Sequence, residues 1–453
     1  MIDHTLPSPA TSGLLPPYAQ HDSSQADEQL ERVIGPWGLG VNAVNTAVGG
    51  GIFVMPGLVA AILGPAAILA YLFCAVAIGL VLTCFVEIGS FVRRSGGPVA
   101  YVEEAFGPLA GFLAWILYAV GFDMIASAAI ANVLIDAVAV VLPPLAHGLW
   151  RMVGFFVLFG SLAAINIVGV KHGLRLSAAT TIAKLVPLLF VMVGAVFVMN
   201  WDNFHWTGWP STANLGEGTL LIFFAFQGAE EALSPSAEIK NPAHAVPRAM
   251  LGALAALIFL YVGLQIASQG VLGSDLGRNA TAPLADVAAK IGGPSGRALL
   301  LTGVAISVFG SLAAGMIATP RSFFLMAQNG MLPGALARVH PKFHTPHIAV
   351  LAVAALTFLF AVSGAFKHLA ILSSASVLCV YLAICLGALR LRYTREKVSG
   401  AFRAPGGPIV GILGAASVIW LMTYTTRVEF GALAATFVLA SLYYAARKRH
   451  GIL

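Results

Sequence analysis

The stretch VNTAVGGGIFVMPG, residues 44–57, lies inside a long apolar segment of the chain. Its three consecutive glycines each lower helix propensity by about 1 kcal/mol relative to alanine. Pro56 has no amide hydrogen to donate to the carbonyl of Ile52, so one helical hydrogen bond is lost. The stretch therefore predicts a membrane-spanning helix that is interrupted near its middle.

The composition is typical of a polytopic membrane protein. Of the 453 residues, 58% are hydrophobic and 10% are charged, and the mean hydropathy is +0.88, which is far more apolar than a soluble domain. The net charge of +6 comes from basic residues in short loops without interleaved aromatics, so no nucleic-acid partner is expected. The four cysteines lie in apolar segments without CxxC spacing, and neither a metal nor a cofactor is expected.

Apolar runs of about 18 residues or more, each long enough to cross a bilayer, recur along the chain. We place twelve of them, near residues 38–64, 66–92, 109–142, 151–170, 177–200, 217–234, 245–272, 298–327, 347–365, 367–391, 408–427 and 429–447. Lysine and arginine gather in the loops that share one side when the N-terminus is inside, so both termini are predicted to be cytoplasmic.

Three segments outside the spans are too polar to cross a membrane. Residues 1–34, rich in Pro, Ser, Gln and Asp, predict a disordered cytoplasmic tail, and residues 448–453 predict a short cytoplasmic tail at the other end. Residues 95–107, between the second and third spans, predict a short amphipathic helix at the inner surface.

The sixth span carries a second interruption. In GEGTLLIFFAFQGAEEALSPSAEIKNP, residues 216–242, Gly228 is followed by two glutamates and then by Pro235. Irregular backbone at membrane depth persists only where protein or a water-filled cavity surrounds it, and two adjacent carboxylates would be costly against lipid. Interruptions five spans apart favour an inverted-repeat transporter with its binding site at the breaks. The alternative for the glycines is close packing against a neighbouring helix.

Four segments together resemble the amino acid-polyamine-organocation (APC) family of transporters. They are VGGGIF in the first span, GGPVAYVEEAFG after the second, FFAFQGAEEALSPSAEIKNPAHAVPRAM around the sixth, and PRSFFLMAQNGMLPGALARVHPKFHTPHIAV after the eighth. The resemblance covers nearly everything from about Val33 onward. Gly50 stands where the family usually has serine, and departures also occur at residues 237–238 and 328–329, so the substrate is left open.

The resemblance implies an all-α polytopic membrane protein with about twelve transmembrane helices and a LeuT-like fold. Two inverted five-helix repeats, about 38–200 and 217–391, are followed by two C-terminal helices, about 408–447, within a transporter domain of residues 35–447. It further implies a secondary active transporter that carries amino acids by alternating access.

The breaks supply the groups that an amino acid needs. A half-helix that starts after a break has free amides and a partial positive charge, which suit an α-carboxylate. In the family's terms, the amides of Gly49, Gly50 and Gly51 hold that carboxylate. The resemblance likewise assigns the α-ammonium to the carbonyls of Phe224, Ala225 and Gln227.

Side chains near the breaks suggest further roles. Phe224 and Phe226 are candidates for a gate over the ligand, with simple packing as the alternative. Asp123 and Glu230 are intramembrane acids, and if both face the cavity they favour a cationic side chain such as that of arginine, lysine or a polyamine. The alternative is that Glu230 or Glu231 sits in water at the cytoplasmic mouth.

Lys184, in TTIAKLVPLLFVMVG, is a basic residue deep inside the fifth span. A buried ammonium is costly to keep charged, so we expect Lys184 to gain and lose a proton or to be held permanently by acceptors. In proton-coupled members of the family a lysine here takes the place of a sodium ion, which implies proton coupling. The alternative is a fixed structural cation, as in an obligate exchanger of amino acids or polyamines.

Other classes of function find less support in the sequence. A membrane-embedded enzyme would need a GxSxG elbow or an HExxH pair within the spans, and neither occurs. A sensor or a channel would need a large soluble domain or a repeated filter loop. Short loops and tails favour a bacterial inner membrane, with an amino acid, a proton and the lipid bilayer as partners, while the oligomeric state stays open.

Overall fold

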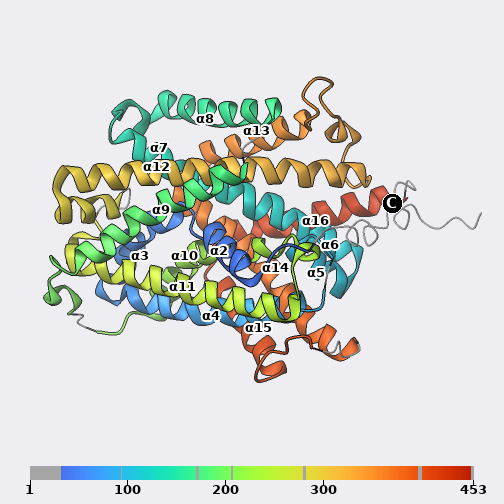
Figure 1. Ribbon diagram of the computed structural model, residues 1–453, viewed down its shortest axis with the longest axis horizontal. Coiled ribbons are helices and arrows are strands. Elements are labelled where there is room, and N and C mark those ends of the chain that lie inside the picture. The colour runs from blue at the N-terminus through green and yellow to red at the C-terminus, as the bar shows by residue number, and fades with distance from the viewer. Residues whose placement is uncertain are drawn as a thin grey trace, which may run out of the picture.

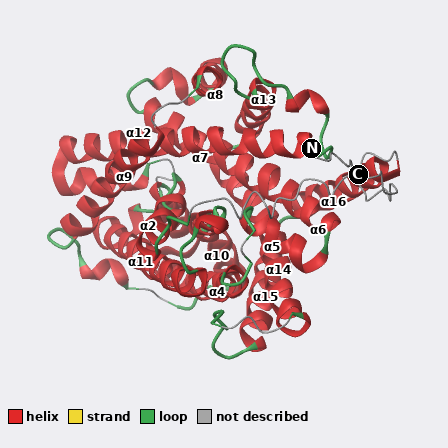
Figure 2. Ribbon diagram, turned by 45° about the vertical axis from the view of Figure 1, so that its right-hand side comes forward, coloured by secondary structure: helices red, strands yellow, loops and turns green. Residues whose placement is uncertain are grey.

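The structure, a computed structural model, describes residues 32–92, 94–169, 173–205, 208–278, 282–395 and 400–449; for 173–183 it describes the backbone alone. Nearly all of these residues are helical, and no strand longer than an isolated bridge occurs among them (Figure 2). Among the described residues, seven helical segments are long and apolar enough to cross a membrane, and three shorter apolar helices accompany them. The prediction of an all-α polytopic membrane protein is confirmed, whereas the number of twelve spans and the inverted repeat stay predictions.

The helices succeed one another along the chain with short connections (Figure 1). They are α2 (Pro36–Ala47), α3 (Met55–Leu63), α4 (Ala67–Gly89), α5 (Gly97–Phe106), α6 (Pro108–Ile116), α7 (Ile125–Ala139), α8 (Gly148–Val168), α9 (Gly173–Ala195), α10 (Thr212–Phe226), α11 (Pro242–Leu272), α12 (Pro283–Gln328), α13 (His347–Ser363), α14 (Phe366–Thr394), α15 (Pro408–Met422) and α16 (Arg427–Arg449).

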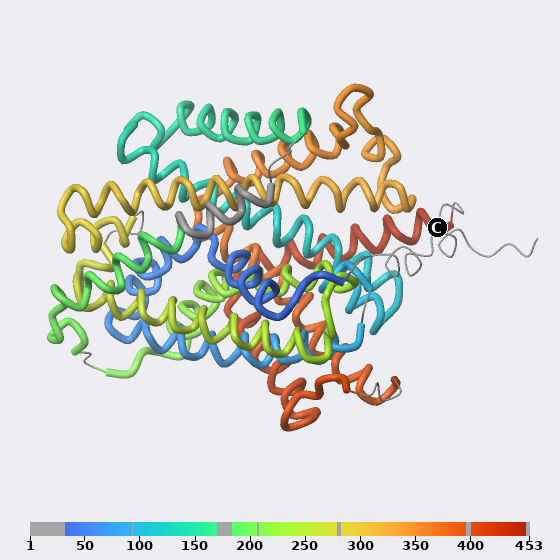
Figure 3. The backbone as a smooth tube through the Cα atoms, in the orientation of Figure 1, coloured from blue at the N-terminus to red at the C-terminus, as the bar shows by residue number. Residues whose placement is uncertain are grey.

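The helices form a bundle whose centre holds the interrupted segments. Helix α12 runs the length of the molecule, with α8 and α13 packed together beyond it, while α4 and α11 pack together on the opposite side (Figure 1). The blue first break and the green α10 meet between these two groups (Figure 3). Large apolar side chains are exposed on α8 and α16, including Phe156, Val438 and Leu442, as lipid-facing helices require.

Both interruptions predicted from the sequence are confirmed. Helix α2 ends at Ala47 and α3 begins at Met55, with a 3-10 turn at Gly51–Phe53 between them. Helix α10 ends at Phe226 and is followed by short 3-10 turns instead of a continuing helix. Gly228 there has φ +95, a left-handed conformation that glycine adopts without steric cost.

Two further irregularities depart from the predicted spans. Residues Leu117–Met124 form a π-helix between α6 and α7, where the sequence predicts one regular third span. The segment α12 consists of two helices joined at Gly292 and Gly293, whose backbone angles are not helical, so a separate helix precedes the one that contains the predicted span from residue 298. A π-helix has about one more residue per turn than the α-helices on either side of it, so the side chains before and after it point toward different partners.

The entry to the first span is bonded to the connection that follows the sixth. Ile34 and Ile239 form an isolated parallel bridge. The Ile34 amide donates to the Glu238 carbonyl at 3.0 Å, and the Lys240 amide donates to the Ile34 carbonyl at 2.9 Å. Helix α5 occupies the predicted amphipathic segment and joins the same connection, because the Gly96 amide donates to the Ser234 carbonyl at 3.0 Å.

Candidate functional site

The first break presents free backbone amides. The Gly49 amide donates to the Ala47 carbonyl at 2.8 Å within a tight turn, so it is already engaged. The next three amides, of Gly50, Gly51 and Ile52, have no acceptor within the part of the chain that the structure describes. The three free backbone amides therefore lie one residue later in the chain than the predicted set of Gly49, Gly50 and Gly51.

The glycines of the first break do not adopt an unusual backbone geometry, since none of the three has a positive φ. Their lack of a side chain instead lets neighbouring side chains approach the backbone closely. A Cβ on Gly51 would lie 2.8 Å from Cδ1 of Phe224, and one on Gly50 would lie 2.9 Å from Cγ2 of Val308. A Cβ on Gly49 would meet nothing closer than the Ala47 carbonyl at 4.0 Å. Side chains thus press on two of the three glycines.

The second break presents carbonyls. Beyond Phe226 the backbone is extended at Gln227 (ψ 158), so the last carbonyls of α10 lose their helical donors. The hydroxyl of Tyr261, on α11, lies 2.8 Å from the Ala225 carbonyl and 3.1 Å from the Ala47 carbonyl. The single hydroxyl hydrogen of Tyr261 thus lies between a carbonyl of each break. One of these carbonyls, that of Ala225, is a predicted acceptor for the ammonium group. The carbonyls of Phe224 and Gln227 have no donor among the described residues.

The side chains of the second break are held by neighbouring helices. Nε2 of Gln227 donates to Oγ of Ser374 at 2.7 Å, so this side chain points toward α14. Phe224 packs edge-on against Phe366 with ring centroids 5.5 Å apart, and the same ring covers Gly51. An aromatic ring between the amide-bearing break and α14 fits the gate that the sequence suggests for Phe224. The ring of Phe226 instead packs on Tyr261, which favours packing for that residue.

Lys184 reaches the end of α2. Its ammonium donates to the carbonyls of Asn45 and Val48, both at 2.9 Å, and the residue is 3% exposed. These carbonyls lie at the C-terminal end of α2, where the helix dipole carries partial negative charge. The arrangement ties α9 to the first break.

The two intramembrane acids are bonded to protein donors. Oε1 of Glu230 accepts from the Tyr118 hydroxyl at 3.0 Å, and Oε2 accepts from the Gly228 amide at 3.1 Å. Asp123 accepts from the Thr319 hydroxyl. Glu230 is 2% exposed, so the alternative of a solvated position at the cytoplasmic mouth is wrong for this residue. Within the described ranges, neither acid forms an ion pair with a basic side chain.

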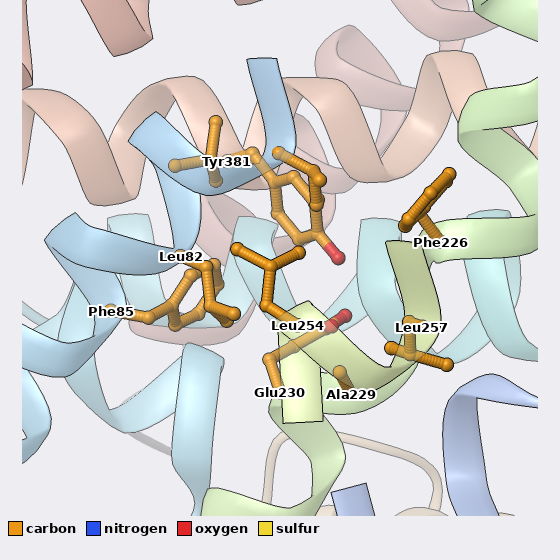
Figure 4. A pocket seen from close by; sticks show the side chains of 10 residues that line it. Leu82, Phe85, Phe226, Ala229, Glu230, Leu254, Leu257 and Tyr381 are labelled. Carbon is orange, nitrogen blue, oxygen red and sulfur yellow. The ribbon is translucent and has the colours of Figure 1, made fainter. Parts of the chain in front are cut away.

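Glu230 also borders a small cavity of about 10 Å³. Its walls are aliphatic and aromatic side chains of α4, α10 and α11, together with Tyr381 (Figure 4). A volume of this size holds roughly one water molecule and excludes an amino acid. No cluster of three metal-ligating side chains occurs in the ranges described.

Sequence reasoning missed the hydroxyl-bearing side chains that organise the breaks. These are Tyr118, Tyr261, Thr319 and Ser374, each from a different span. The signal available was a polar group in an apolar span, which must find a partner because lipid offers none. That signal identifies the residues but leaves their partners open.

Two interrupted helices that meet inside an apolar bundle, one offering amides and the other carbonyls, define a membrane transporter of the discontinuous-helix class. A family model described as "Amino acid permease" matches residues 34–444, and the chain belongs to this family. The resemblance to the APC family is confirmed, and the chain is a transporter, not an enzyme.

Named relatives resemble the chain over nearly its whole length. The serine/threonine exchanger SteT of Bacillus subtilis is 30% identical over 448 residues, covering 93% of this chain and 98% of the relative. The methylthioribose transporter of the same bacterium is 26% identical, covering 94% and 95%. Its branched-chain amino acid permease BcaP is also 26% identical, covering 90% and 92%.

Proposed function

We propose that this chain is a secondary transporter that carries a neutral amino acid across the cell membrane by alternating access. The single observation that carries the proposal is the meeting of the two breaks, with free amides at 50–52 on one side and free carbonyls of Phe224 and Gln227 on the other. The proposal includes twelve spans, two inverted five-helix repeats, and both termini in the cytoplasm.

The backbone groups match the two charges of an amino acid. The α-carboxylate binds the amides of Gly50, Gly51 and Ile52, where a half-helix begins and its dipole is positive. The α-ammonium binds the carbonyls of Phe224 and Gln227, which end the preceding half-helix of the sixth span. Phe224 covers the bound carboxylate, since its ring already lies against Gly51.

A neutral side chain is favoured over a cationic one, which differs from the expectation based on Asp123 and Glu230. Both carboxylates are already bonded to protein hydroxyls, and Glu230 uses both of its oxygens. A cationic substrate would have to break these bonds before it gained a partner. The names of SteT and BcaP, which refer to uncharged amino acids, agree with this preference.

We propose Lys184 as the site that couples the substrate to a proton. It contacts the first break directly, so a change in its charge alters the bonds that hold the end of α2. Exchange without proton coupling is the second candidate, because a relative named an exchanger covers 93% of this chain at 30% identity. In that case Lys184 is a permanent structural cation.

Uptake of radiolabelled serine, leucine and arginine into proteoliposomes tests these proposals. Transport of the neutral pair, with weak inhibition by arginine, supports the assignment of the substrate, and preference for arginine contradicts it. Accumulation driven by an inward proton gradient alone supports coupling, whereas uptake that requires internal amino acid supports exchange.

The variant Lys184→Ala separates the two roles of the lysine. Under the coupling proposal it loses accumulation driven by the proton gradient. If Lys184→Ala still concentrates substrate when only a proton gradient is supplied, Lys184 is not the coupling site. The surface variant Lys367→Ala, which removes an exposed pair with Glu217, is the control for loss of a lysine.

A further inference from the structure

We infer that Glu230 is a positioning residue that sets the geometry of the second break, and that Tyr118 acts through it. Glu230 on this view contacts neither the substrate nor a transported proton. The inference rests on the proposed function and deepens it, because it gives Glu230, the intramembrane acid beside the binding site, the role of shaping that site.

The carboxylate of Glu230 closes a small ring of contacts around Gly228. Its Oε2 accepts from the Gly228 amide, two residues earlier in the chain, while its Oε1 accepts from Tyr118. Gly228 is the residue with φ +95, so the bond holds the backbone in the conformation that ends the regular helix. The orientation of the preceding carbonyl, that of Gln227, follows from this conformation.

Gly228 also transmits its position to the first break. A Cβ added to it would lie 3.3 Å from the Thr46 carbonyl, near the end of α2. The two breaks are therefore in backbone contact at this glycine. A displacement of Gly228 changes the spacing between the groups that we assign to the carboxylate and to the ammonium.

Tyr118 is itself held firmly, which suits a residue that positions another. It lies in the π-helix Leu117–Met124, and two neighbours anchor that segment. The Ser373 hydroxyl of α14 donates to the Phe122 carbonyl at 3.2 Å, and the Thr319 hydroxyl of α12 donates to Asp123. The segment thus links α12 and α14 to the second break through the bond from Tyr118 to Glu230.

The surroundings of Glu230 separate it from any substrate. Figure 4 shows the Glu230 carboxylate and the Tyr381 hydroxyl directed toward one another among Leu82, Phe85, Leu254 and Leu257. The cavity there is about 10 Å³, far below the volume of an amino acid. The Tyr381 hydroxyl is fully buried and has no hydrogen-bond partner in the described part of the chain. Glu230 therefore faces groups of the protein on every side that the structure describes.

Kinetics of neutral amino acid uptake test the inference with a graded series of variants. Glu230→Gln keeps an oxygen for the Gly228 amide and a polar group for Tyr118, so the KM should stay within about threefold of wild type. Tyr118→Phe and Glu230→Ala remove one and two of the contacts, and each should raise the KM by about tenfold or more while Vmax changes less. Because Tyr118 acts through Glu230, adding Tyr118→Phe to Glu230→Ala should cause no further rise.

Controls come from residues of the same type outside the site. Glu217→Gln changes an exposed glutamate on α10, and Tyr443→Phe removes a hydroxyl from α16; both should transport like wild type. The pH profile of uptake in Glu230→Gln should match that of wild type, since the side chain carries no proton in transport. If Glu230→Ala fails to fold, Glu230→Gln and Tyr118→Phe still decide the matter.

Three results would overturn the inference. The first is a Glu230→Gln protein that folds and yet loses uptake or its pH dependence, as a proton carrier would. The second is weaker inhibition of uptake by cationic amino acids in Glu230→Gln than in wild type, as expected if the Glu230 carboxylate binds the substrate. The third is a normal KM for Tyr118→Phe. Failure of the wild-type protein to transport any amino acid would instead refute the proposed function.

Discussion

Replacement of Gly51 by alanine adds one methyl group at the centre of the site. The new Cβ would lie 2.8 Å from Cδ1 and 2.9 Å from Cε1 of Phe224, well inside normal carbon contact. The Phe224 ring has little freedom to retreat, because Phe366 packs edge-on against it with centroids 5.5 Å apart. Either the ring or the backbone of the first break must move.

Overpacking of this kind costs about 1–3 kcal/mol in a well-packed interior. If the cost falls on the binding-competent conformation, it weakens substrate binding by about 5- to 140-fold, since 1.4 kcal/mol is a factor of ten. The adjacent Gly49→Ala provides a matched control, because its Cβ has no neighbour closer than 4.0 Å. We expect its affinity to stay within about twofold of wild type.

Equilibrium binding of radiolabelled serine to the purified protein measures both variants, and a thermal melt verifies that each is folded. The double variant Gly51→Ala with Phe224→Leu should regain part of the affinity, because a smaller side chain makes room for the methyl group. Equal affinities for Gly49→Ala and Gly51→Ala would show that contact with Phe224 does not govern the site.

Three further changes have defined outcomes. Gly50→Ser should reduce transport, because its Cβ would lie 2.9 Å from Cγ2 of Val308 and 3.0 Å from Cβ of Ile130. Val308→Ala in the same chain should restore part of the uptake rate, and no rescue would contradict this reasoning. Arg151→Leu removes the donors that contact Asp136 at 2.6 Å and Asn132 at 2.7 Å, so it should lower the free energy of unfolding by about 2 kcal/mol. Lys367→Leu, which removes an exposed ion pair, should change the Tm little. Equal changes of Tm in the two variants would refute the comparison. Burial raises the pKa of Tyr101 in α5 to about 12, so unfolding near pH 11 releases a proton from this residue. The free energy of unfolding should therefore fall as the pH rises toward 12. Tyr101→Phe should make the fall of Tm from pH 9 to 11 shallower.

The sequence was sufficient to locate the breaks, because Gly and Pro act on local backbone energetics. The glycines at 49–51 and the Gly228 to Pro235 stretch each weaken a helix wherever it sits, and the structure interrupts the helices there. Lys184 does bond to the carbonyls of the first break, and its role in proton coupling stays a prediction. The family assignment rested on motifs in four segments, and the family model that matches residues 34–444 confirms the assignment.

The partners of the polar side chains could not be derived in this way. Periodicity assigns a residue to a face of its own helix, whereas Glu230 meets Tyr118 across 112 positions of sequence. The π-helix at Leu117–Met124 makes the problem harder, since it rotates the third span out of the regular period. The turn that engages the Gly49 amide depends on the exact path of the backbone after Ala47, which composition does not specify.

The parallel bridge between Ile34 and Ile239 has a mechanical consequence for the bundle. It fastens the start of α2 to the start of α11 with two backbone hydrogen bonds. Two such bonds are worth about 1–3 kcal/mol together, which sets a separated arrangement at roughly one molecule in 160 to one in six. Small displacements of the first span therefore carry the start of α11 with them, and a large displacement begins with the rupture of these two bonds.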